Sequence, residues 1–600
     1  MRAIMAFSPR RPGQGANRPG QSANRPGRSA KESPGARRGH RLHLTAAVAA
    51  VAALAVAAAG CGSSASKPPA AKGHKGGVFT ILANSSFGTA DPAQNYTLEE
   101  WQLLIMTHDG LVGFAHEGGA ADTHLVPDLA TSIPKPTDGG KTYVFGIRRG
   151  IKFSDGQVLK PSDFVRTFER QYTVPGPTTF YSSIIGACKP GAKSCPGIAK
   201  GVVANDSAYT LTIHLTAADP EFLDKLALPF AFVVPASTPL ASTKNNVPPG
   251  TGPYMWKSYN PTGAAVLVRN PYFHVWNAAA QPAGYPNEII EKYGLQVSDE
   301  VTEVENGQAN EVFDGDQIPS DQLSQLNSPR YAGQVHVNTL TADWYFALNT
   351  KRPPFNNLKA RQAINYAANR AAYVKIAGGP SLAVPACQIL PPGFPSYQAY
   401  CPYTAGASNG KWTAPDLAKA RALVKASGTA GMKVVVDGTN DQVGKALVEQ
   451  MISDLDSIGY KATPQLLSGS VQYPFVQNSS NLGKWNVGWS AWYQDYPAPS
   501  DFLNVLLGCG SIHPNSDASP NIAEFCDPSI QAQITRAESI EATQPATAAK
   551  LWTQVDHEDT NMAPWVDLYN PKQIDFLSKN VHGYEWGPQW YILVDRLWLS

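Results

Sequence analysis

The chain has 600 residues, with 49 lysines and arginines against 47 aspartates and glutamates, and a formal net charge of +2 at pH 7. This length exceeds one ordinary hydrophobic core, so two or three domains are expected. Residues 1–60 hold ten Lys/Arg and one acidic residue, Glu32, which leaves 39 basic and 46 acidic residues in the rest of the chain. The rest is therefore acidic, and its charge gives no support for nucleic-acid binding.

Residues 1–60 have the pattern of a signal peptide behind a disordered basic leader. The pentapeptide Ala-Asn-Arg-Pro-Gly occurs at 16–20 and again at 23–27, and such low-complexity repeats do not build a core. A basic region that includes Arg41 then precedes an apolar, alanine-rich run at 44–59. This order is typical of a secretory signal, and the run is short for a membrane-spanning helix.

Cys61 directly follows Ala-Gly at the end of this apolar run. A cysteine at this place resembles the bacterial lipoprotein signal, in which it becomes the lipidated first residue of the mature protein. Ala58 departs from that signal, which usually has Leu there. A plain cleaved signal and a single membrane helix remain the alternatives. Residues 61–75 are rich in Ser, Ala, Pro, Lys and Gly, so we expect a flexible tether.

Folded structure is expected from Gly76, where a glycine break precedes a short β run at 76–82. Residues 138–148 predict a turn into a strand, and 149–156 predict a second strand with an Asp-Gly turn. A helix is expected to begin at Pro161 or Ser162.

The later part of the chain alternates between strand and helix patterns. Residues 209–215 alternate as a strand, and Gly250–Tyr254 predicts a tight turn that needs glycine. The Val434–Val436 run predicts a strand, and Asp441–Ile458 has apolar residues at helical spacing. The mixture of strands and helices throughout indicates an α/β or α+β fold.

Besides Cys61 the chain has six cysteines, whose spacing suggests three local pairs: Cys188 with Cys195, Cys387 with Cys401, and Cys509 with Cys526. Six cysteines allow fifteen pairings, and an even number in an exported chain favours disulfides. Metal binding is the alternative, but no Cys-x-x-Cys or paired-histidine spacing accompanies these residues. We therefore expect loop disulfides and no metal site.

Five ordered segments resemble the solute-binding proteins of ABC importers, family 5, the oligopeptide, dipeptide and nickel type. They are Leu125–Gly156, Gly250–Tyr272, Phe346–Arg370, Trp492–Pro499 and Ala563–Asn570. The resemblance covers nearly all of the chain after Gly76. Each segment alone is a weak signal, and their order along the chain carries the resemblance.

The resemblance implies an α/β, two-lobed, periplasmic-binding-protein-like fold of the class II type, with an extra domain inserted in lobe one. Lobe one would combine residues 76–108, 250–335 and 570–600. The inserted domain would span 109–249, and lobe two 336–569. Hinges would lie near 335 and 570, and ligand binding would favour the closed arrangement of the lobes.

Asp495 is the main candidate for ligand binding. In peptide binders of this family an acidic residue in the Trp-x-x-Asp-Tyr pattern receives the ammonium group of the ligand, and this chain has Trp492 and Tyr496 around Asp495. A carboxylate in a closed cleft makes a strong charge-assisted bond to an ammonium group. Alternatively, Asp495 caps the turn before Pro497. Trp492 and Tyr496 would form an aromatic wall against the ligand, or else fill the core.

The resemblance also places Trp344, Tyr345, His108 and Asp109 near the cleft. Residues 361–370 predict an amphipathic helix in which Arg361 and Arg370 serve as structural ion-pair partners, with ligand contact as the alternative.

These observations predict an extracytoplasmic lipoprotein, anchored to the outer face of the cell membrane. We expect a monomer without a cofactor that captures short peptides by lobe closure and delivers them to membrane permease subunits with cytoplasmic ATPases. A non-peptide solute (a metal chelate, an amine-bearing small molecule or an oligosaccharide) is the alternative, and an extracellular hydrolase is a weaker one. The sequence has no Gly-x-Ser-x-Gly and no His-Glu-x-x-His motif, so we expect no enzymatic activity.

Overall fold

A mixed sheet of 12 strands forms the backbone of the folded part of the chain. The computed structural model describes residues 73–600 except 87, 175, 177, 314, 407, 408 and 518. Cys61 and the predicted signal lie outside the described residues. Residues 73–76, where the expected tether ends, already contact the fold: the Gly76 N–H donates to the Tyr285 carbonyl (3.0 Å), and the His74 ring lies against Trp598.

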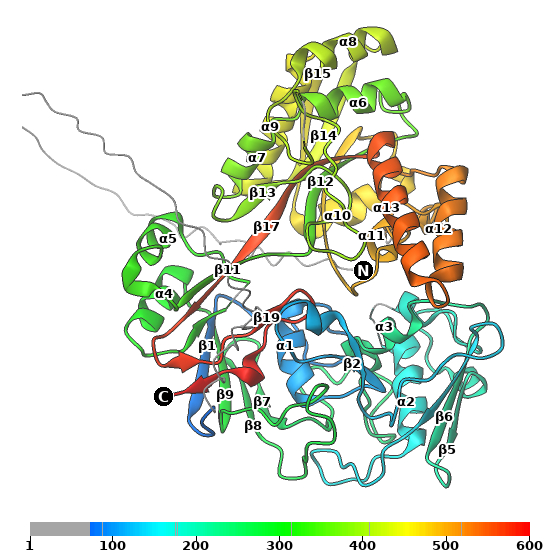
Figure 1. Cartoon of the computed structure of the whole chain (residues 1–600), viewed down its shortest axis with the longest axis vertical. Coiled ribbons are helices and arrows are strands. Elements are labelled where there is room, and N and C mark those ends of the chain that lie inside the picture. Colours follow the sequence, from blue (N-terminus) through cyan, green and yellow to red (C-terminus); the bar gives the residue numbers. More distant parts are fainter. Residues whose placement is uncertain are drawn as a thin grey trace, which may run out of the picture. The chain divides into compact units, whose positions relative to one another are not determined.

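One half of the sheet belongs to lobe one (Figure 1). Its strands run in the order β10 (Glu311–Val312), β1 (Val78–Ala83), β9 (Glu288–Tyr293), β8 (Ala264–Arg269) and β7 (Tyr254–Tyr259). The helices of this half are α1 (Leu98–Thr107), α4 (Val297–Glu305) and α5 (Ser320–Leu326).

Residues 109–249 add two small antiparallel sheets to lobe one. The first pairs β2 (Val112–Phe114) with β3 (Leu125–Pro127), and the second has the order β4 (Thr142–Gly146), β6 (Thr210–His214) and β5 (Val202–Asn205). The helices are α2 (Pro161–Thr173) and α3 (Phe222–Leu226). Their apolar side chains share one core with β1 and α1, so this segment packs continuously onto lobe one.

The other half of the sheet belongs to lobe two. Its strands are β15 (Lys461–Leu467), β14 (Lys433–Thr439), β16 (Val487–Tyr493) and β12 (Ala342–Leu348), with β13 (Ala383–Pro385) at β17. Its helices are α6 (Leu358–Ala367), α7 (Arg370–Ile376), α8 (Leu417–Ser427), α9 (Gln442–Ser457), α10 (Gly469–Gln477), α11 (Ser500–Leu503), α12 (Pro528–Glu541) and α13 (Pro545–Met562). Two hydrophobic cores, one on each face of β12, hold this lobe together.

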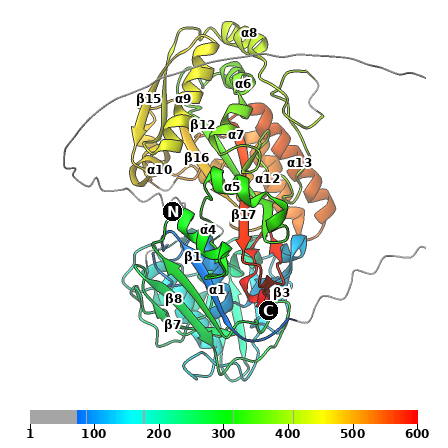
Figure 2. The same ribbon diagram turned by 90° about the vertical axis from the view of Figure 1, so that its left-hand side faces the viewer.

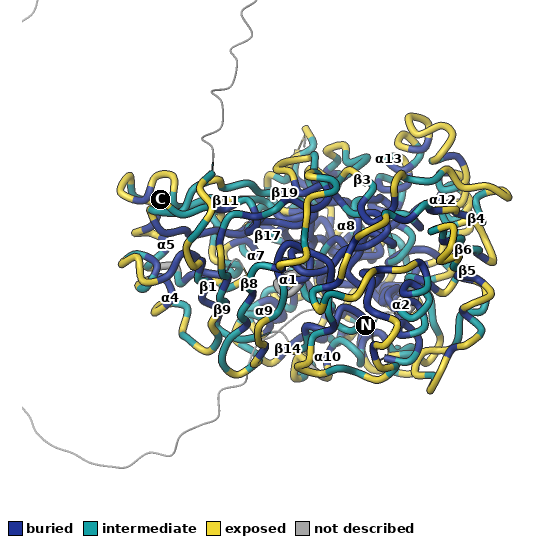
Figure 3. The backbone as a smooth tube through the Cα atoms, turned by 90° about the horizontal axis from the view of Figure 1, so that it is seen from below, coloured by how far each residue is buried: buried dark blue, intermediate teal, exposed yellow. Residues whose placement is uncertain are grey.

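Two strands run between the lobes. The long strand β17 (Trp565–Leu577) pairs with β12 and β13 through its first half and with β11 (Val335–Thr339) and β10 through its second half. Figure 2 shows β17 passing from one lobe to the other, and Figure 3 shows its backbone in the buried middle of the fold. Short strands close the C-terminal segment: β18 (Val581–His582), β19 (Trp586–Gly587), β20 (Tyr591–Ile592) and β21 (Trp598–Leu599).

The structure confirms most of the local elements expected from the sequence. Helix α2 begins at Pro161, and Asp441 caps α9 through a hydrogen bond from the Gly444 N–H (2.9 Å). Gly252 donates its N–H to the Thr107 carbonyl (3.0 Å), and a Cβ there would lie 2.5 Å from the Met106 oxygen. Only glycine fits so close to the end of α1.

Three local expectations were wrong. Residues 149–156 form no regular strand and have only an isolated bridge between Lys152 and Val158. The helix expected at 361–370 is split, because Asn369 starts a new helix by accepting the Ala372 N–H. Arg361 and Arg370 are structural, but they donate to backbone carbonyls instead of forming ion pairs.

The three disulfides join the cysteines as the spacing suggested, Cys188 to Cys195, Cys387 to Cys401, and Cys509 to Cys526. Within residues 73–600, as far as they are described, no group of three or more His, Cys, Asp or Glu side chains could hold a metal ion. None of the described helices is long and apolar enough to cross a membrane.

Candidate ligand-binding site

Asp495 lies in the loop between β16 and α11, at the end of a central strand of lobe two. Asp501, in α11, fixes this loop: its Oδ2 accepts the Asp495 N–H (3.0 Å) and the indole N–H of Trp492 (3.4 Å). Trp492 thus supports the loop from the lobe-two core, in which its ring is buried.

The Asp495 side chain meets lobe one. The hydroxyl of Tyr96, in the segment before α1, donates to Asp495 Oδ2 at 2.6 Å. A second link comes from the C-terminal segment, where the Gln589 amide donates to the Asp495 carbonyl (3.1 Å) and accepts from the Gln494 amide (2.6 Å). Asp495 therefore lies where three parts of the chain, far apart in sequence, come together.

Asp495 is only 7 % exposed, and burial raises the pKa of its carboxyl to about 7, although the Tyr96 hydrogen bond acts in the opposite direction. The pKa of the Tyr96 hydroxyl is raised well above its usual range, by burial and by Asp495, so the tyrosine keeps its proton and donates. Burial and the neighbouring Asp495 also raise the pKa of Asp501. Among the described residues, no lysine, arginine or histidine forms an ion pair with Asp495.

Tyr496 points away from the lobe-two core. Its ring packs with the apolar residues of lobe one, and the Lys225 ammonium lies 5.7 Å from the ring centroid. Lys225 is paired with Asp219 (2.8 Å). Tyr496 thus contributes to the contact between the lobes directly beside Asp495.

Trp344 and Tyr345 are neighbours in β12 and project to opposite faces of the sheet, as successive strand residues do. Trp344 packs against Trp489 and Tyr569 in one core, whereas Tyr345 stacks on Trp565 in the other (3.7 Å between centroids). Both residues pack within lobe two.

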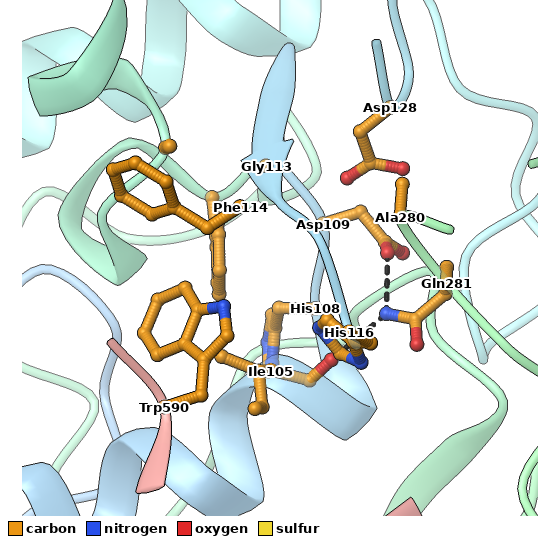
Figure 4. A pocket seen from close by; sticks show the side chains of 12 residues that line it. Ile105, His108, Asp109, Gly113, Phe114, His116, Asp128, Ala280, Gln281 and Trp590 are labelled. Carbon is orange, nitrogen blue, oxygen red and sulfur yellow. Dashed lines mark hydrogen bonds between the residues drawn. The ribbon is translucent and has the colours of Figure 1, made fainter. Parts of the chain in front are cut away.

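His108 and Asp109 line a cavity of about 10 Å³ inside lobe one, which has room for a single water molecule (Figure 4). Burial lowers the pKa of His108 to about 4, and its Nε2 lies 3.0 Å from the Pro248 carbonyl. The Gln281 amide donates to Asp109 (2.6 Å), and burial raises the Asp109 pKa to about 6. No residue of the Asp495 loop lines this cavity.

A larger cavity, of about 340 Å³, lies beside β13 and the Cys387–Cys401 loop, and its lining includes Trp412 and Asn570. None of the seven predicted ligand-binding residues lines it. The structure therefore places Asp495 and Tyr496 in one loop, with Trp492 near the end of the adjoining strand β16, and places the other four elsewhere.

Sequence reasoning missed Tyr96 and Gln589. Tyr96 lies 399 positions before Asp495, and it belongs to none of the five segments that carry the family resemblance. Its hydrogen bond to Asp495 can be recognised only in the folded chain, where the two lobes are in contact.

The family described as "Bacterial extracellular solute-binding proteins, family 5 Middle" matches residues 124–514, which is more than half of the chain. The chain therefore belongs to this family of solute-binding proteins.

Two curated relatives span most of the chain. Di/tripeptide-binding protein 4 of Pseudomonas aeruginosa (strain UCBPP-PA14) is 28% identical over 488 residues, covering 78% of this chain and 85% of the relative. Heme-binding protein A of Haemophilus influenzae (strain ATCC 51907 / DSM 11121 / KW20 / Rd) is 26% identical over 503 residues, covering 78% and 83%.

Among solved structures, "Clavulanic acid biosynthesis oligopeptide binding protein 2" superposes with a TM-score of 0.78 and 22% identity, covering 88% of this chain and 96% of that one. DppA from Helicobacter pylori, solved with the peptide STSA, gives a TM-score of 0.67 at 21% identity, covering 88% and 98%. These likenesses show the two-lobed fold.

Proposed function

We propose that this chain is the extracytoplasmic substrate-binding component of an ABC importer and that it captures short peptides by closure of its two lobes. The observation that carries the proposal is the buried Asp495 carboxyl, which lies at the contact between the lobes and forms no ion pair with any residue that the structure describes.

A peptide would supply the positive charge that pairs with the Asp495 carboxylate. Its terminal ammonium group would pair with Asp495, lower the pKa of the carboxyl and remove the cost of burying it unpaired. The names of several relatives, which are di/tripeptide-, oligopeptide- and dipeptide-binding proteins, support this choice of ligand.

The rest of the proposed function follows from the export pattern and the family. The protein would be held at the outer face of the cell membrane by a lipid on Cys61. As a monomer without a cofactor, it would deliver the bound peptide to permease subunits that are driven by cytoplasmic ATPases. It would bind its solute without chemical turnover.

Native mass spectrometry of residues 73–600, purified without denaturation from an exporting host, tests the proposal. We expect adducts with the masses of two to five amino acids, and we expect Asp495→Asn to lose them. Asp454→Asn is the matched control. Asp454 is also a buried carboxyl that accepts a tyrosine hydroxyl (Tyr373, 2.9 Å), but Asp454 and Tyr373 both lie inside lobe two.

A single uniform non-peptide adduct would replace the peptide assignment with another solute and leave the binding role intact. Two of the similar proteins are named for non-peptide ligands: a heme-binding protein and a structure in complex with agropinic acid. Turnover of an added peptide or ester by the pure protein would contradict the binding role itself.

A further inference from the structure

The segment that carries Tyr96 is locked in place. Asp91, five residues earlier, forms a two-pronged ion pair with the buried Arg170 (2.9 and 2.7 Å). The Asn95 side chain accepts the Thr97 N–H (3.1 Å), and the Asn95 carbonyl accepts the Trp101 indole N–H (3.3 Å). Both neighbours of Tyr96 are therefore fixed before any ligand arrives.

The Tyr96 ring is held by other aromatic rings of lobe one. It stacks on Trp101 (6.0 Å between centroids) and meets the edges of Phe230 (5.3 Å) and Phe180 (6.3 Å). This packing fixes the direction in which the ring points, so the hydroxyl stands toward Asp495 of the opposite lobe without further ordering.

A hydroxyl group in this position can do more than donate a hydrogen bond to the carboxylate. It has one proton to donate and two lone pairs to accept, and here the proton goes to Asp495. An ammonium group has three N–H donors and needs several acceptors once it is buried. The Tyr96 oxygen is therefore able to accept one N–H from a ligand whose charge is paired with Asp495.

We propose that Tyr96 is the lobe-one half of the ammonium site, so that a free terminal amine is held by Asp495 from lobe two and by Tyr96 from lobe one. This inference rests on the proposed peptide function and adds a specificity-determining residue to it. Because the two acceptors belong to different lobes, the ligand gains both contacts only when the lobes meet. Recognition of the free amine is thereby coupled to closure.

The test compares retention of a random tripeptide library with retention of the same library after N-acetylation, measured by native mass spectrometry. The proteins are the wild type, Tyr96→Phe and Tyr373→Phe. Phenylalanine keeps the ring packing and removes only the hydroxyl. Tyr373 is the matched control, since its hydroxyl also donates to a buried aspartate, but within one lobe. The unfolding temperature of each variant verifies that it is folded.

We expect the wild type to prefer the free over the acetylated library, and Tyr96→Phe to reduce this preference about tenfold, as for the loss of a hydrogen bond to a charged group. Tyr373→Phe should keep the wild-type preference. If Tyr96→Phe also keeps it while the wild type binds peptides, the role of Tyr96 is refuted and the peptide function stands. A wild type that retains neither library contradicts the peptide function and the role of Tyr96 together.

Discussion

At the scale of single residues, Asp495 should give peptide binding a characteristic dependence on pH. Its pKa in the ligand-free protein is raised to about 7 by burial, and the ammonium group of a peptide needs the ionised carboxylate. Binding below pH 7 must therefore release a proton. We expect affinity to rise by up to about tenfold per pH unit from pH 5 to 7 and then to level off.

Isothermal titration calorimetry at several pH values measures this slope. Asp495→Asn, whose affinity should be low at every pH, removes the contribution of Asp495 while every other titrating group remains. The same slope in the wild type and in the variant would show that another group binds the ammonium.

The same residue should make the ligand-free protein less stable at high pH. The pKa of Asp495 in the folded protein lies above its ordinary value of 3.8, so the folded state holds the proton longer than the unfolded state. The free energy of unfolding therefore falls as pH rises from about 4 to 7. We expect Asp495→Asn to unfold at a higher temperature than the wild type at pH 8, with a smaller difference at pH 4. Thermal denaturation without ligand checks this, and a less stable variant at pH 8 would contradict it.

The sequence makes Asp495 a candidate because it occupies the acidic position of the family's Trp-x-x-Asp-Tyr pattern. It does not identify Tyr96, whose partner is distant in the chain. Trp344 and Tyr345 illustrate another limit. The resemblance places both near the cleft, but their partners in two separate cores depend on how the helices pack on each face of the sheet. A pattern within one strand cannot specify that packing.

At the scale of secondary structure elements, helices with apolar residues at helical spacing were the easiest to predict. Helix α9 is one of these, and in the structure Asp441 caps its start by accepting the Gly444 N–H. The division between α6 and α7 was missed, because Ala367 and Ala368 continue the apolar pattern of the helix up to Asn369. Asn369 nevertheless caps a new helix, and its own N–H donates to Asp454 of α9 (3.2 Å), a tertiary contact with no local signal.

The Cys387–Cys401 disulfide closes a loop that holds helix α13. Within this loop the Gln388 amide and the Leu390 N–H donate to the buried Asp556 of α13, at 2.5 and 3.1 Å. The cysteines are 14 residues apart, so the cross-link should contribute about 3 kcal/mol by restricting the unfolded chain. We expect replacement of both cysteines by alanine to lower the free energy of unfolding by about this amount.

Urea denaturation measures this loss. The Cys188–Cys195 pair is the internal comparison, since its separation of only 7 residues predicts a smaller loss. If removal of the Cys188–Cys195 disulfide lowers the free energy of unfolding by more than removal of Cys387–Cys401, loop length does not govern the stabilisation.

At the scale of the whole molecule, the contact between the lobes is rich in carboxyl groups. From lobe one, the α3 region brings Asp219, Glu221 and Asp224, with Lys225 as their nearby cation. From lobe two come Asp501 of α11 and Glu538 and Glu541 of α12. The pKa of Glu538 and that of Glu541 are each raised to about 7, first by burial and then by Glu221 of the other lobe.

These shifts predict that closure without ligand depends on pH. When the lobes separate, the glutamates of α12 regain water and lose the repulsion from Glu221, so their pKa values return toward 4.5. The closed arrangement therefore binds more protons than the open one, and its population should fall as pH rises from about 5 to 8.

Small-angle X-ray scattering of the ligand-free protein should give a larger radius of gyration at pH 8 than at pH 5.5. Glu221→Gln should reduce that difference, because it removes the charge that both glutamates face. A radius that stays constant with pH in the wild type would show that these carboxyl groups do not oppose closure. The carboxylates that face each other across the contact would then leave ligand-free closure unaffected, and the ammonium at Asp495 and Tyr96 would be the main electrostatic control on the lobes.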